Sequence, residues 1–444
     1  MSKKFRDWLF ILFIVTFVVS AFFVSIYAAG YSFRRTWPPR FDQLFEKTGM
    51  LILDSEPENA VIYLNNERQR SFWLNDIGRG DITTPTKIKN MIPGEYTLRL
   101  EKEGYWPLEK KVVIESGKAT FAEDFILFRQ TTPSNLAICV PQELSFSPEK
   151  KNFLILPAEG LVINLKTETS SQLTNKSILP IQWSQNGSKI LFNGQLIALN
   201  NDNINFDIKS LTKSATNFYW DEANDKIYYQ DDGAINCVAT GNQTVSTVLK
   251  GGNYAAYAVR SGLIYTIEKE TDRTYLRIYD ADTFLRQSSS DLPSGDYHFQ
   301  QNKYRLDLYD NRQKALYVLN DGTEQPLARQ IKPVVSWQWL DSNYLFWHNG
   351  FEIYTLDIDN GQQTLLVRTG DELTGIAWNR SKNYLLYSSA KEIQIVNLNL
   401  EQKMPISLLK AEEINNLWLD EKNQIIYFYA KIDDKAGVYK LQLQ

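Results

Sequence analysis

The sequence predicts a mainly β protein with one transmembrane α-helix, a small β-domain and a β-propeller of eight blades. Three features predict this fold: an uncharged apolar segment near the amino terminus, a compact series of alternating strand-like segments after it, and a pattern that recurs through the remaining chain. The chain has 444 residues, enough for about three structural units. Aromatic residues make up 13% of it, a proportion that suits packed β-structure.

The composition excludes several classes of protein. Hydrophobic residues make up 43% and charged residues 23%, which is typical of a folded chain and not of a disordered one. The net charge of -4 lacks the basic surplus needed to coat nucleic acid, so no nucleic-acid partner is expected. The chain has only two cysteines and two histidines, which excludes a disulfide-dense scaffold and a Cys/His zinc module.

The first predicted element is a transmembrane helix. Trp8 to Gly30 is a run of 23 residues without a charge, long enough to cross a hydrocarbon core of ~30 Å. The run is apolar on all sides, which excludes a soluble core helix with a polar face. A cleaved signal peptide is the alternative, but its apolar region runs only ~7–15 residues, and no small-residue cleavage site follows. We therefore expect residues 1–7 to be a tail and residues 8–30 to be an uncleaved anchor.

Charge does not decide the orientation of this anchor. Three basic residues lie near each end of it: Lys3, Lys4 and Arg6 before it, and Arg34, Arg35 and Arg40 after it. A short amino-terminal tail before a long chain resembles a signal-anchor, and large following domains translocate largely regardless of charge. We expect a single-pass protein of the cell membrane, with everything after residue 31 extracytoplasmic. A cytoplasmic location for the bulk of the chain is the alternative.

A stalk and a small β-domain follow the anchor. Residues 31–48, which include Pro38-Pro39, are predicted to be the stalk, and residues 49–130 the β-domain. The pair Pro93-Gly94 is a strong turn signal, and period-two alternation marks the strands. The strands are predicted at residues 50–53, 60–64, 86–88, 96–100 and 111–114.

Several spaced motifs of this domain resemble those of the PEGA domain. They are a strand that starts at Gly49, a Ser-x-Pro-x-x-Ala turn at Ser55, Pro57 and Ala60, Thr84-Pro85, Pro93-Gly94-Glu95-Tyr96, and Lys102-x-Gly104-Tyr105. The resemblance implies a small β-sandwich, of a kind common in cell-envelope and surface proteins, without catalytic residues.

The sequence departs from this family at two places. Asn59 stands at the third position of the eponymous Pro-Glu-Gly-Ala, where asparagine also tolerates a left-handed turn. The stretch from residue 65 to 83 is longer than the usual hairpin, so its conformation is left open. It contains Arg79-Gly80-Asp81, a tripeptide that some adhesion receptors read. We interpret the tripeptide as a chance occurrence in a polar loop.

The rest of the chain carries an eightfold repeat. In each copy an aromatic residue, here called the anchor, precedes about six polar or turn residues and then an apolar strand. The anchors are spaced 37 to 42 residues apart, which suits four short strands per copy and predicts a β-propeller over residues 135–444. The anchors are Phe146, Trp183, Trp220, Tyr257, Phe299, Trp339, Trp378 and Trp418. The copies at Phe146 and Trp183 resemble the Trp-Ser-Pro-Asp-Gly repeat of TolB-like and related WD-like propellers.

The chain ends predict how the ring closes. Only 26 residues follow Trp418, enough for two strands after the one that holds the anchor, so residues 136–140 are expected to supply the missing outer strand. The predicted ring has eight blades, or seven if the weak copy at Tyr257 or Phe299 is irregular. Each anchor is expected to end an inner strand and pack between blades; a ligand platform is the alternative.

The sequence offers no recognisable catalytic constellation. His298 and His348 are the only histidines that could serve a nucleophile, and each is interpreted as an ordinary blade or loop residue. Cys139 and Cys237 lie in apolar strands of different predicted blades and are expected to be buried free thiols. Residues 357–361 faintly resemble a calcium loop but lack the remaining ligands, so a hairpin turn is the better interpretation. We predict no catalytic residue, no cofactor and no metal site.

These features favour a non-enzymatic, membrane-anchored protein of the cell envelope. Its PEGA-like domain and propeller would bind another envelope protein or a glycan. One alternative is a propeller enzyme, a hydrolase or lyase, with a site at the channel mouth. Another is a membrane-tethered cytoplasmic scaffold. Each function rests on fold-level analogy, because unrelated activities share the propeller fold.

Overall fold

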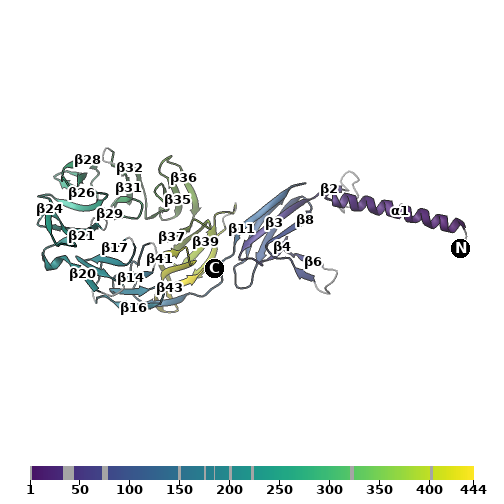
Figure 1. The fold of residues 1–444 in the computed structure, drawn as a ribbon, viewed down its shortest axis with the longest axis horizontal. Coiled ribbons are helices and arrows are strands. Elements are labelled where there is room, and N and C mark those ends of the chain that lie inside the picture. The colour runs from purple at the N-terminus through teal and green to yellow at the C-terminus, as the bar shows by residue number, and fades with distance from the viewer. Residues whose placement is uncertain are drawn as a thin grey trace. The chain divides into compact units, whose positions relative to one another are not determined.

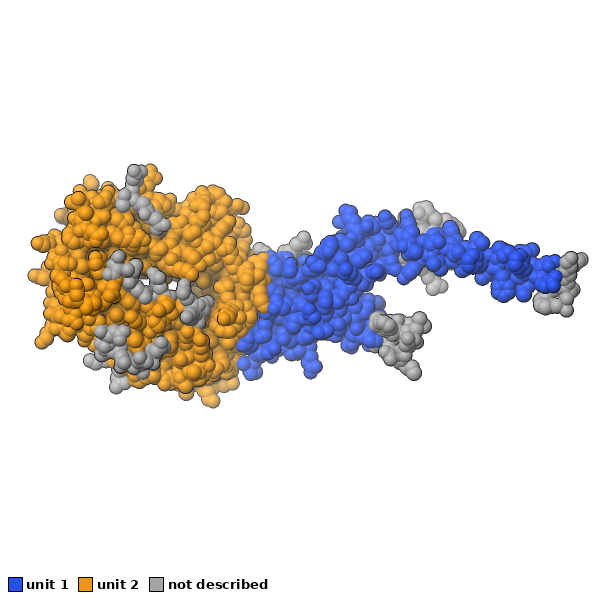
Figure 2. Space-filling view, viewed as in Figure 1, with its two compact units in different colours: residues 1–132, 397–406, 442–444 blue, residues 133–396, 407–441 orange. Residues whose placement is uncertain are grey.

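The computed structural model describes residues 3–33, 45–72, 79–148, 152–174, 177–184, 186–199, 203–221, 225–320, 325–400 and 404–444. The chain divides into two compact units, which Figure 1 and Figure 2 show. The first unit holds the amino-terminal helix and the small β-domain, and the second holds the propeller. The first comprises residues 1–132, 397–406 and 442–444, and the second residues 133–396 and 407–441.

The apolar segment near the amino terminus is a helix. α1 runs from Lys3 to Ala28, and the part from Arg6 to Ala28 is long and apolar enough to cross a membrane. This part is 0% buried, so the structure itself provides no apolar surroundings for it. The helix stops before Gly30, whose φ of 83° lies in the left-handed region that glycine adopts at helix ends. α1 is therefore a candidate transmembrane helix.

A short two-stranded sheet follows the helix where the sequence predicts a stalk. β1 (Tyr31–Phe33) pairs antiparallel with β2 (Phe45–Lys47). The backbone N–H and the hydroxyl of Thr48 both donate to the carbonyl oxygen of Gly30, at 2.8 and 2.7 Å. The central part of the predicted stalk, residues 34–44, lies outside the described residues.

The small β-domain has two main sheets around one core. One sheet has the order β10 (Leu108–Ile114), β9 (Gly94–Glu101), β4 (Val61–Leu64), β5 (Glu67–Arg68), and the other has β11 (Ala119–Ile126), β3 (Gly49–Glu56), β8 (Thr86–Met91). Alternate residues of β3 are buried, as period-two patterning requires. Each predicted strand overlaps one of these elements, although the strand predicted at residues 60–64 begins one residue before β4. β11, which pairs in parallel with β3, is an addition to the predicted strands. The buried core includes Leu51, Leu53, Ile62, Leu98, Leu100 and Phe125.

Two of the family motifs meet in a buried hydrogen-bond cluster. The hydroxyls of Ser55 and Thr84 lie 2.5 Å apart, and the Thr84 hydroxyl accepts from the backbone N–H of Ala60 at 3.0 Å. The Ser55 hydroxyl also donates to the carbonyl oxygen of Pro57 at 2.9 Å. Asn59 has a φ of 65°, so the asparagine adopts the left-handed turn expected of it. The cluster explains the spacing of the two motifs, because the Ser-x-Pro-x-x-Ala turn and Thr84 supply hydrogen-bond partners to each other.

The long insertion of this domain forms a hairpin, as far as it is described. β6 (Arg70–Phe72) pairs antiparallel with β7 (Arg79–Asp81), and residues 73–78 lie outside the described residues. The tripeptide at residues 79–81 therefore lies in a strand and not in a polar loop.

In the part of the chain that the structure describes, the propeller consists of eight four-stranded sheets, each with strands hydrogen-bonded in succession. The first strands are β13 (Ser145–Phe146), β17 (Ile181–Trp183), β21 (Thr216–Asp221), β25 (Tyr254–Arg260), β29 (Tyr297–Gln301), β33 (Ser336–Trp339), β37 (Leu373–Asn379) and β41 (Glu413–Asp420). The second strands are β14 (Phe153–Leu156), β18 (Lys189–Phe192), β22 (Lys226–Asp231), β26 (Leu263–Glu270), β30 (Leu306–Asp310), β34 (Tyr344–His348), β38 (Tyr384–Ser389) and β42 (Ile425–Ile432).

The third and fourth strands complete each sheet. The third strands are β15 (Leu161–Asn164), β19 (Gln195–Ala198), β23 (Ala234–Ala239), β27 (Arg273–Asp280), β31 (Ala315–Leu319), β35 (Glu352–Asp357), β39 (Glu392–Asn397) and β43 (Lys435–Gln442). The fourth strands are β16 (Thr169–Gln172), β20 (Asn203–Asp207), β24 (Val245–Leu249), β28 (Arg286–Leu292), β32 (Leu327–Ile331), β36 (Gln363–Arg368), β40 (Ile406–Lys410) and, for the last sheet, β12 (Ser134–Ile138). Figure 1 shows first strands such as β21 and β29 inside the ring and fourth strands such as β24 and β28 at its rim.

All eight anchors lie on first strands. Five of them contact the preceding sheet through a hydrogen bond or a ring contact. The indole N–H of Trp183 donates to the Ser145 hydroxyl at 2.8 Å, and that of Trp339 donates to Asp307 at 2.7 Å. Ring contacts pair Phe299 with Tyr265, Trp378 with Phe346, and Phe146 with Trp418. The aromatic repeat thus serves packing between sheets, as expected. Phe146, Trp183 and Trp339 end their strands, whereas the other five anchors lie one to three residues before the strand end.

The predicted closing strand is confirmed. β12 pairs antiparallel with β43, from Ser134 opposite Lys440 to Ile138 opposite Gly437, so the closing strand begins two residues before the predicted one. The strands approach closely at one point: a Cβ on Gly437 would lie 2.2 Å from the carbonyl oxygen of Ala137. The rings of Phe146 and Trp418 stack across the seam at 4.0 Å and 5°. The first and last parts of the propeller are therefore joined by both a ladder and an aromatic pair.

We predict that Gly437→Ala opens this seam. The added methyl group must displace the backbone of β12, and overpacking of this kind costs about 1–3 kcal/mol. Gly370→Ala is the matched control, because a Cβ there meets nothing within 4 Å. Hydrogen exchange of the full chain in detergent should show faster exchange in β12 and β43 for Gly437→Ala alone. Equal exchange in both variants would show that the seam does not depend on this close approach.

Candidate functional site

Four successive sheets carry short loops of the same length and construction. The loops join the first and second strands and have four residues each: 302–305, 340–343, 380–383 and 421–424. In each, a side-chain oxygen at the start of the loop accepts backbone N–H groups two or three residues later, at 2.8 to 3.2 Å. The accepting residues are Asn302, Asp341, Asn379 and Asp420. These side chains satisfy loop backbone groups and hold the four loops in defined conformations.

The four loops surround a cavity of about 550 Å³. Each loop contributes to the lining, and β33 supplies two further residues. A volume of this size is typical of sites that take a small ligand or a few side chains of a partner. The lining residues are Tyr304, Gln338, Trp339, Leu340, Arg380, Ser381 and Glu421.

Two arginines beside the cavity are held by neighbouring loops. Arg380 forms an ion pair with Asp341 and lies 5.3 Å above the ring of Tyr344. Arg305 lies 5.1 Å above the ring of Trp339 and donates to the carbonyl oxygen of Ser342 at 2.6 Å. The side chain of Arg380 is 52% exposed, so it remains accessible to a partner despite the ion pair.

A buried carboxylate lies next to the lining residue Trp339. Asp307 is 0% exposed, and its Oδ2 accepts from the indole N–H groups of Trp337 and Trp339, at 3.0 and 2.7 Å. Its Oδ1 has no hydrogen-bond partner among the described residues. Burial raises the pKa of Asp307 to about 6, although the indole donors and the charges of Arg305 and Arg260 act in the opposite direction. Asp307 therefore fixes the orientation of both indoles, but its carboxyl group is poorly solvated, which disfavours the charged form.

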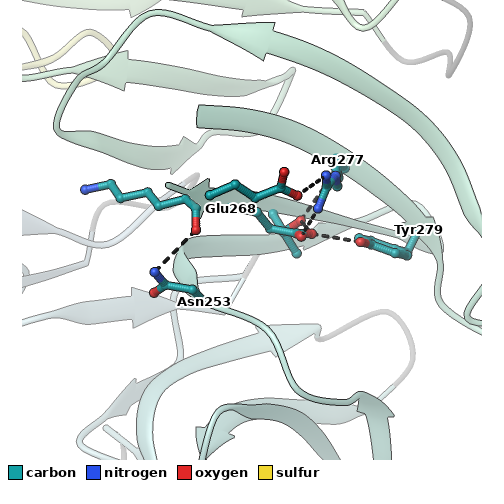
Figure 3. A network of polar contacts seen from close by, with 7 residues as sticks. Asn253, Glu268, Arg277 and Tyr279 are labelled. Carbon is teal, nitrogen blue, oxygen red and sulfur yellow. Dashed lines mark hydrogen bonds and ion pairs between the residues drawn. The ribbon is translucent and has the colours of Figure 1, made fainter. Parts of the chain in front are cut away.

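A second buried polar network lies in the sheet that precedes these loops. The carboxylate of Glu268 accepts from the hydroxyls of Thr266 and Tyr279, each at 2.8 Å, and from Arg277 at 2.5 Å, as Figure 3 shows. Arg277 also pairs with Glu270 at 2.5 Å and lies 4.6 Å from the ring centroid of Tyr275. Each oxygen of Glu268 has a donor, so the buried charge is compensated within the sheet. All of these side chains lie on β26 and β27, so the network connects two strands of one sheet.

The histidines and cysteines singled out in the sequence do not come together. His298 lies on β29, and His348 lies buried on β34 of the next sheet. Nδ1 of His348 accepts from the Gly350 N–H at 3.2 Å, and burial lowers the pKa of His348 to about 4. Cys139 and Cys237 are both buried and free, as predicted. Among the described residues, no group of three or more His, Cys, Asp or Glu side chains is placed to hold a metal ion.

The two loop motifs of doubtful role have local explanations. Asp357 accepts from the backbone N–H groups of Asp359 and Asn360, and Gly361 has a φ of 74°, so residues 357–361 form the predicted hairpin turn. In the tripeptide at residues 79–81, Asp81 pairs with Arg68 at 2.5 Å and lies 3.9 Å from Arg70. The carboxylate of the tripeptide is thus engaged by Arg68 of β5 and lies near Arg70 of β6.

Sequence reasoning singled out Trp339 as an anchor but missed the loop residues of the cavity. Tyr304, Leu340, Arg380 and Glu421 each follow an anchor by one to five positions, in the segments that were treated only as turns. The repeat itself places these segments at one end of the ring. The residues that follow each anchor by one to five positions could have been compared across the copies, and this comparison would have identified the loop residues of the cavity.

We predict that Asp307 makes stability fall as the pH rises from about 4 to about 6. The folded state retains the proton up to a pKa of about 6, whereas the unfolded chain loses it near 3.8, so the native state binds more protons between these values. The Asp307→Asn side chain cannot ionise, so this loss of stability should be absent from the variant. Between pH 4 and pH 7.5, the free energy of unfolding of the natural chain should therefore fall by about 2–3 kcal/mol more than that of the variant. Thermal unfolding of both chains at the two pH values measures this. If the difference in Tm between the two chains is the same at pH 4 and at pH 7.5, the raised pKa of Asp307 is contradicted.

Parts of the chain are similar to a known family and to solved structures. Residues 48–123 match the family model of the PEGA domain. Solved structures similar to the chain include the C-terminal WD40 domain of Sif2, with 11% identity, a TM-score of 0.44, and coverage of 70% of this chain and 98% of that chain. The Dos1 propeller has 11% identity, a TM-score of 0.47, and coverage of 71% and 96%.

A further similar structure is the dihydro-heme d1 dehydrogenase NirN in complex with DHE, with 9% identity, a TM-score of 0.46, and coverage of 71% and 78%. At sequence identities this low, the similarity concerns the fold alone. A search of curated proteins gives no match to the chain. Residues 48–123 are a PEGA domain, which in the sequence follows an apolar amino-terminal helix and precedes a β-propeller.

Proposed function

We propose that the protein is a membrane-anchored binding scaffold whose propeller engages another protein of the cell envelope at the four-loop cavity. The construction of this cavity carries the proposal. Loops from four sheets, each closed by the same kind of side-chain hydrogen bond, present polar and aromatic groups around one opening. Groups held in place before binding lose little conformational entropy on association.

The remaining features support binding in preference to catalysis. His348 is buried and bound to a backbone N–H within its own sheet, and His298 lies on another sheet. Asp307 is covered by two indoles and is 0% exposed, so it is poorly placed to exchange protons with a substrate. Three of the lining residues, Tyr304, Trp339 and Arg380, are of kinds that are enriched at protein interfaces.

The proposed location follows from the helix. α1 exposes an apolar surface on all sides, which a membrane would cover. A PEGA domain directly after such an anchor suits a protein of the cell envelope. We therefore place the PEGA domain and the propeller outside the cytoplasm, with the amino terminus inside.

We predict that a protease added to intact cells removes a tag fused to the carboxy terminus. The propeller is outside in the proposed topology, so lysis is not needed for cleavage. A tag placed before residue 3 should be protected on intact cells and cleaved only after lysis. Protection of the carboxy-terminal tag would reverse the topology and favour a cytoplasmic scaffold.

We also predict that the cavity face contacts the partner in intact cells. A photo-crosslinking amino acid at Ser381, which lines the cavity, should give one discrete adduct on illumination. The matched control is the same group at Ala390, in the turn at the other end of β38 in the same sheet. Adducts of equal yield at both positions, or none at Ser381, would contradict binding at the cavity.

A further inference from the structure

The loops around the cavity differ in charge from the rest of the chain. They carry five basic residues and two acidic ones, although the whole chain has a net charge of -4. The loops at the other ends of the same first and second strands carry six acidic and four basic residues. Positive charge is therefore concentrated in the four loops that line the cavity. The basic residues are Lys303, Arg305, Arg380, Lys382 and Lys422, and the acidic ones are Asp341 and Glu421.

Three of these cations lie over aromatic rings beside the cavity. Arg305 is 5.1 Å from the ring centroid of Trp339, Arg380 is 5.3 Å from that of Tyr344, and Lys303 is 6.0 Å from that of Tyr304. A ring in this position holds the cation without neutralising its charge. The arrangement keeps positive charge at the opening and limits the movement of the side chains that carry it.

The same geometry argues against a neutral glycan as the occupant. Stacking of a sugar requires an open aromatic face, but Trp339 is only 6% exposed and Arg305 lies over its ring. One face of Tyr344 is likewise occupied by Arg380. Carboxylates, in contrast, form paired hydrogen bonds with a guanidinium group and salt-screened attractions with lysines.

We propose that the cavity face binds an acidic segment of the partner protein. This proposal rests on the proposed function and specifies the chemistry of the partner. Carboxylates of the segment would contact Arg380 and Lys422 at the rim, and an adjacent side chain would enter the cavity beside Leu340. Clustered like charges at the rim raise the rate of encounter with an oppositely charged partner and make affinity sensitive to salt.

The test uses the full chain in detergent and two labelled ten-residue peptides. One peptide alternates glutamate with glycine, and the other alternates glutamine with glycine. Fluorescence anisotropy should show binding of the glutamate peptide alone, weakening as salt rises. Arg380→Ala combined with Lys422→Ala should weaken binding roughly tenfold, because two rim charges that attract the peptide are removed.

Arg312→Ala combined with Lys391→Ala is the matched control. These residues lie in the turns at the opposite ends of the second strands, one arginine and one lysine as in the test pair. Their replacement should leave the affinity unchanged. Lys422→Glu alone tests the same prediction without touching the ion pair of Arg380, and should also weaken binding.

Three results would overturn the proposal: equal binding of both peptides, equal loss in the test and control pairs, or tighter binding of a ten-residue oligothymidylate than of the glutamate peptide. The last would identify a general polyanion site. A crosslinked adduct at Ser381 together with no glutamate preference would leave the binding scaffold intact and reject only the acidic partner.

Discussion

The packing of each aromatic anchor against the preceding sheet is the interaction on which the propeller depends. A single four-stranded sheet leaves an apolar face open to water and is marginal by itself. An aromatic side chain buries about 150–250 Å² and so provides much of the contact between two sheets. Where the anchor also donates a hydrogen bond, as Trp183 does to Ser145 and Trp339 does to Asp307, it fixes the position of one sheet relative to the next.

The features predicted from the sequence are those that repeat or alternate. The spacing of the anchors indicated the propeller, and the short segment after Trp418 indicated that the chain ends share a sheet. In the PEGA domain, the spaced motifs indicated the fold because Ser55, Ala60 and Thr84 form one hydrogen-bond cluster. Periodicity and turn chemistry are local properties, so one sequence is enough to detect them.

The features that escaped prediction depend on contacts between distant segments. β11 has an ordinary polar and apolar mixture, and its parallel pairing with β3 is visible only in the fold. The cavity residues looked like turn residues because their function arises from the meeting of four loops, which no single loop encodes. The burial of Asp307 depends on Trp337 and Trp339, some thirty residues away, and no short-range pattern reports such a contact.

The closing of the ring by β12 and β43 has a consequence for biosynthesis. β12 is the first strand of the propeller to be made, and its partner is the last, so the ladder between them spans nearly the whole domain. Until β43 emerges, β12 stays an unpaired edge directly behind a finished PEGA domain, with the exposed apolar side chain of Ile138 on it. Such an edge invites pairing with other chains while about 300 residues are still to be synthesised. A nascent chain of this protein therefore passes through a long interval in which protection by a chaperone, or rapid completion of synthesis, determines whether the ring forms.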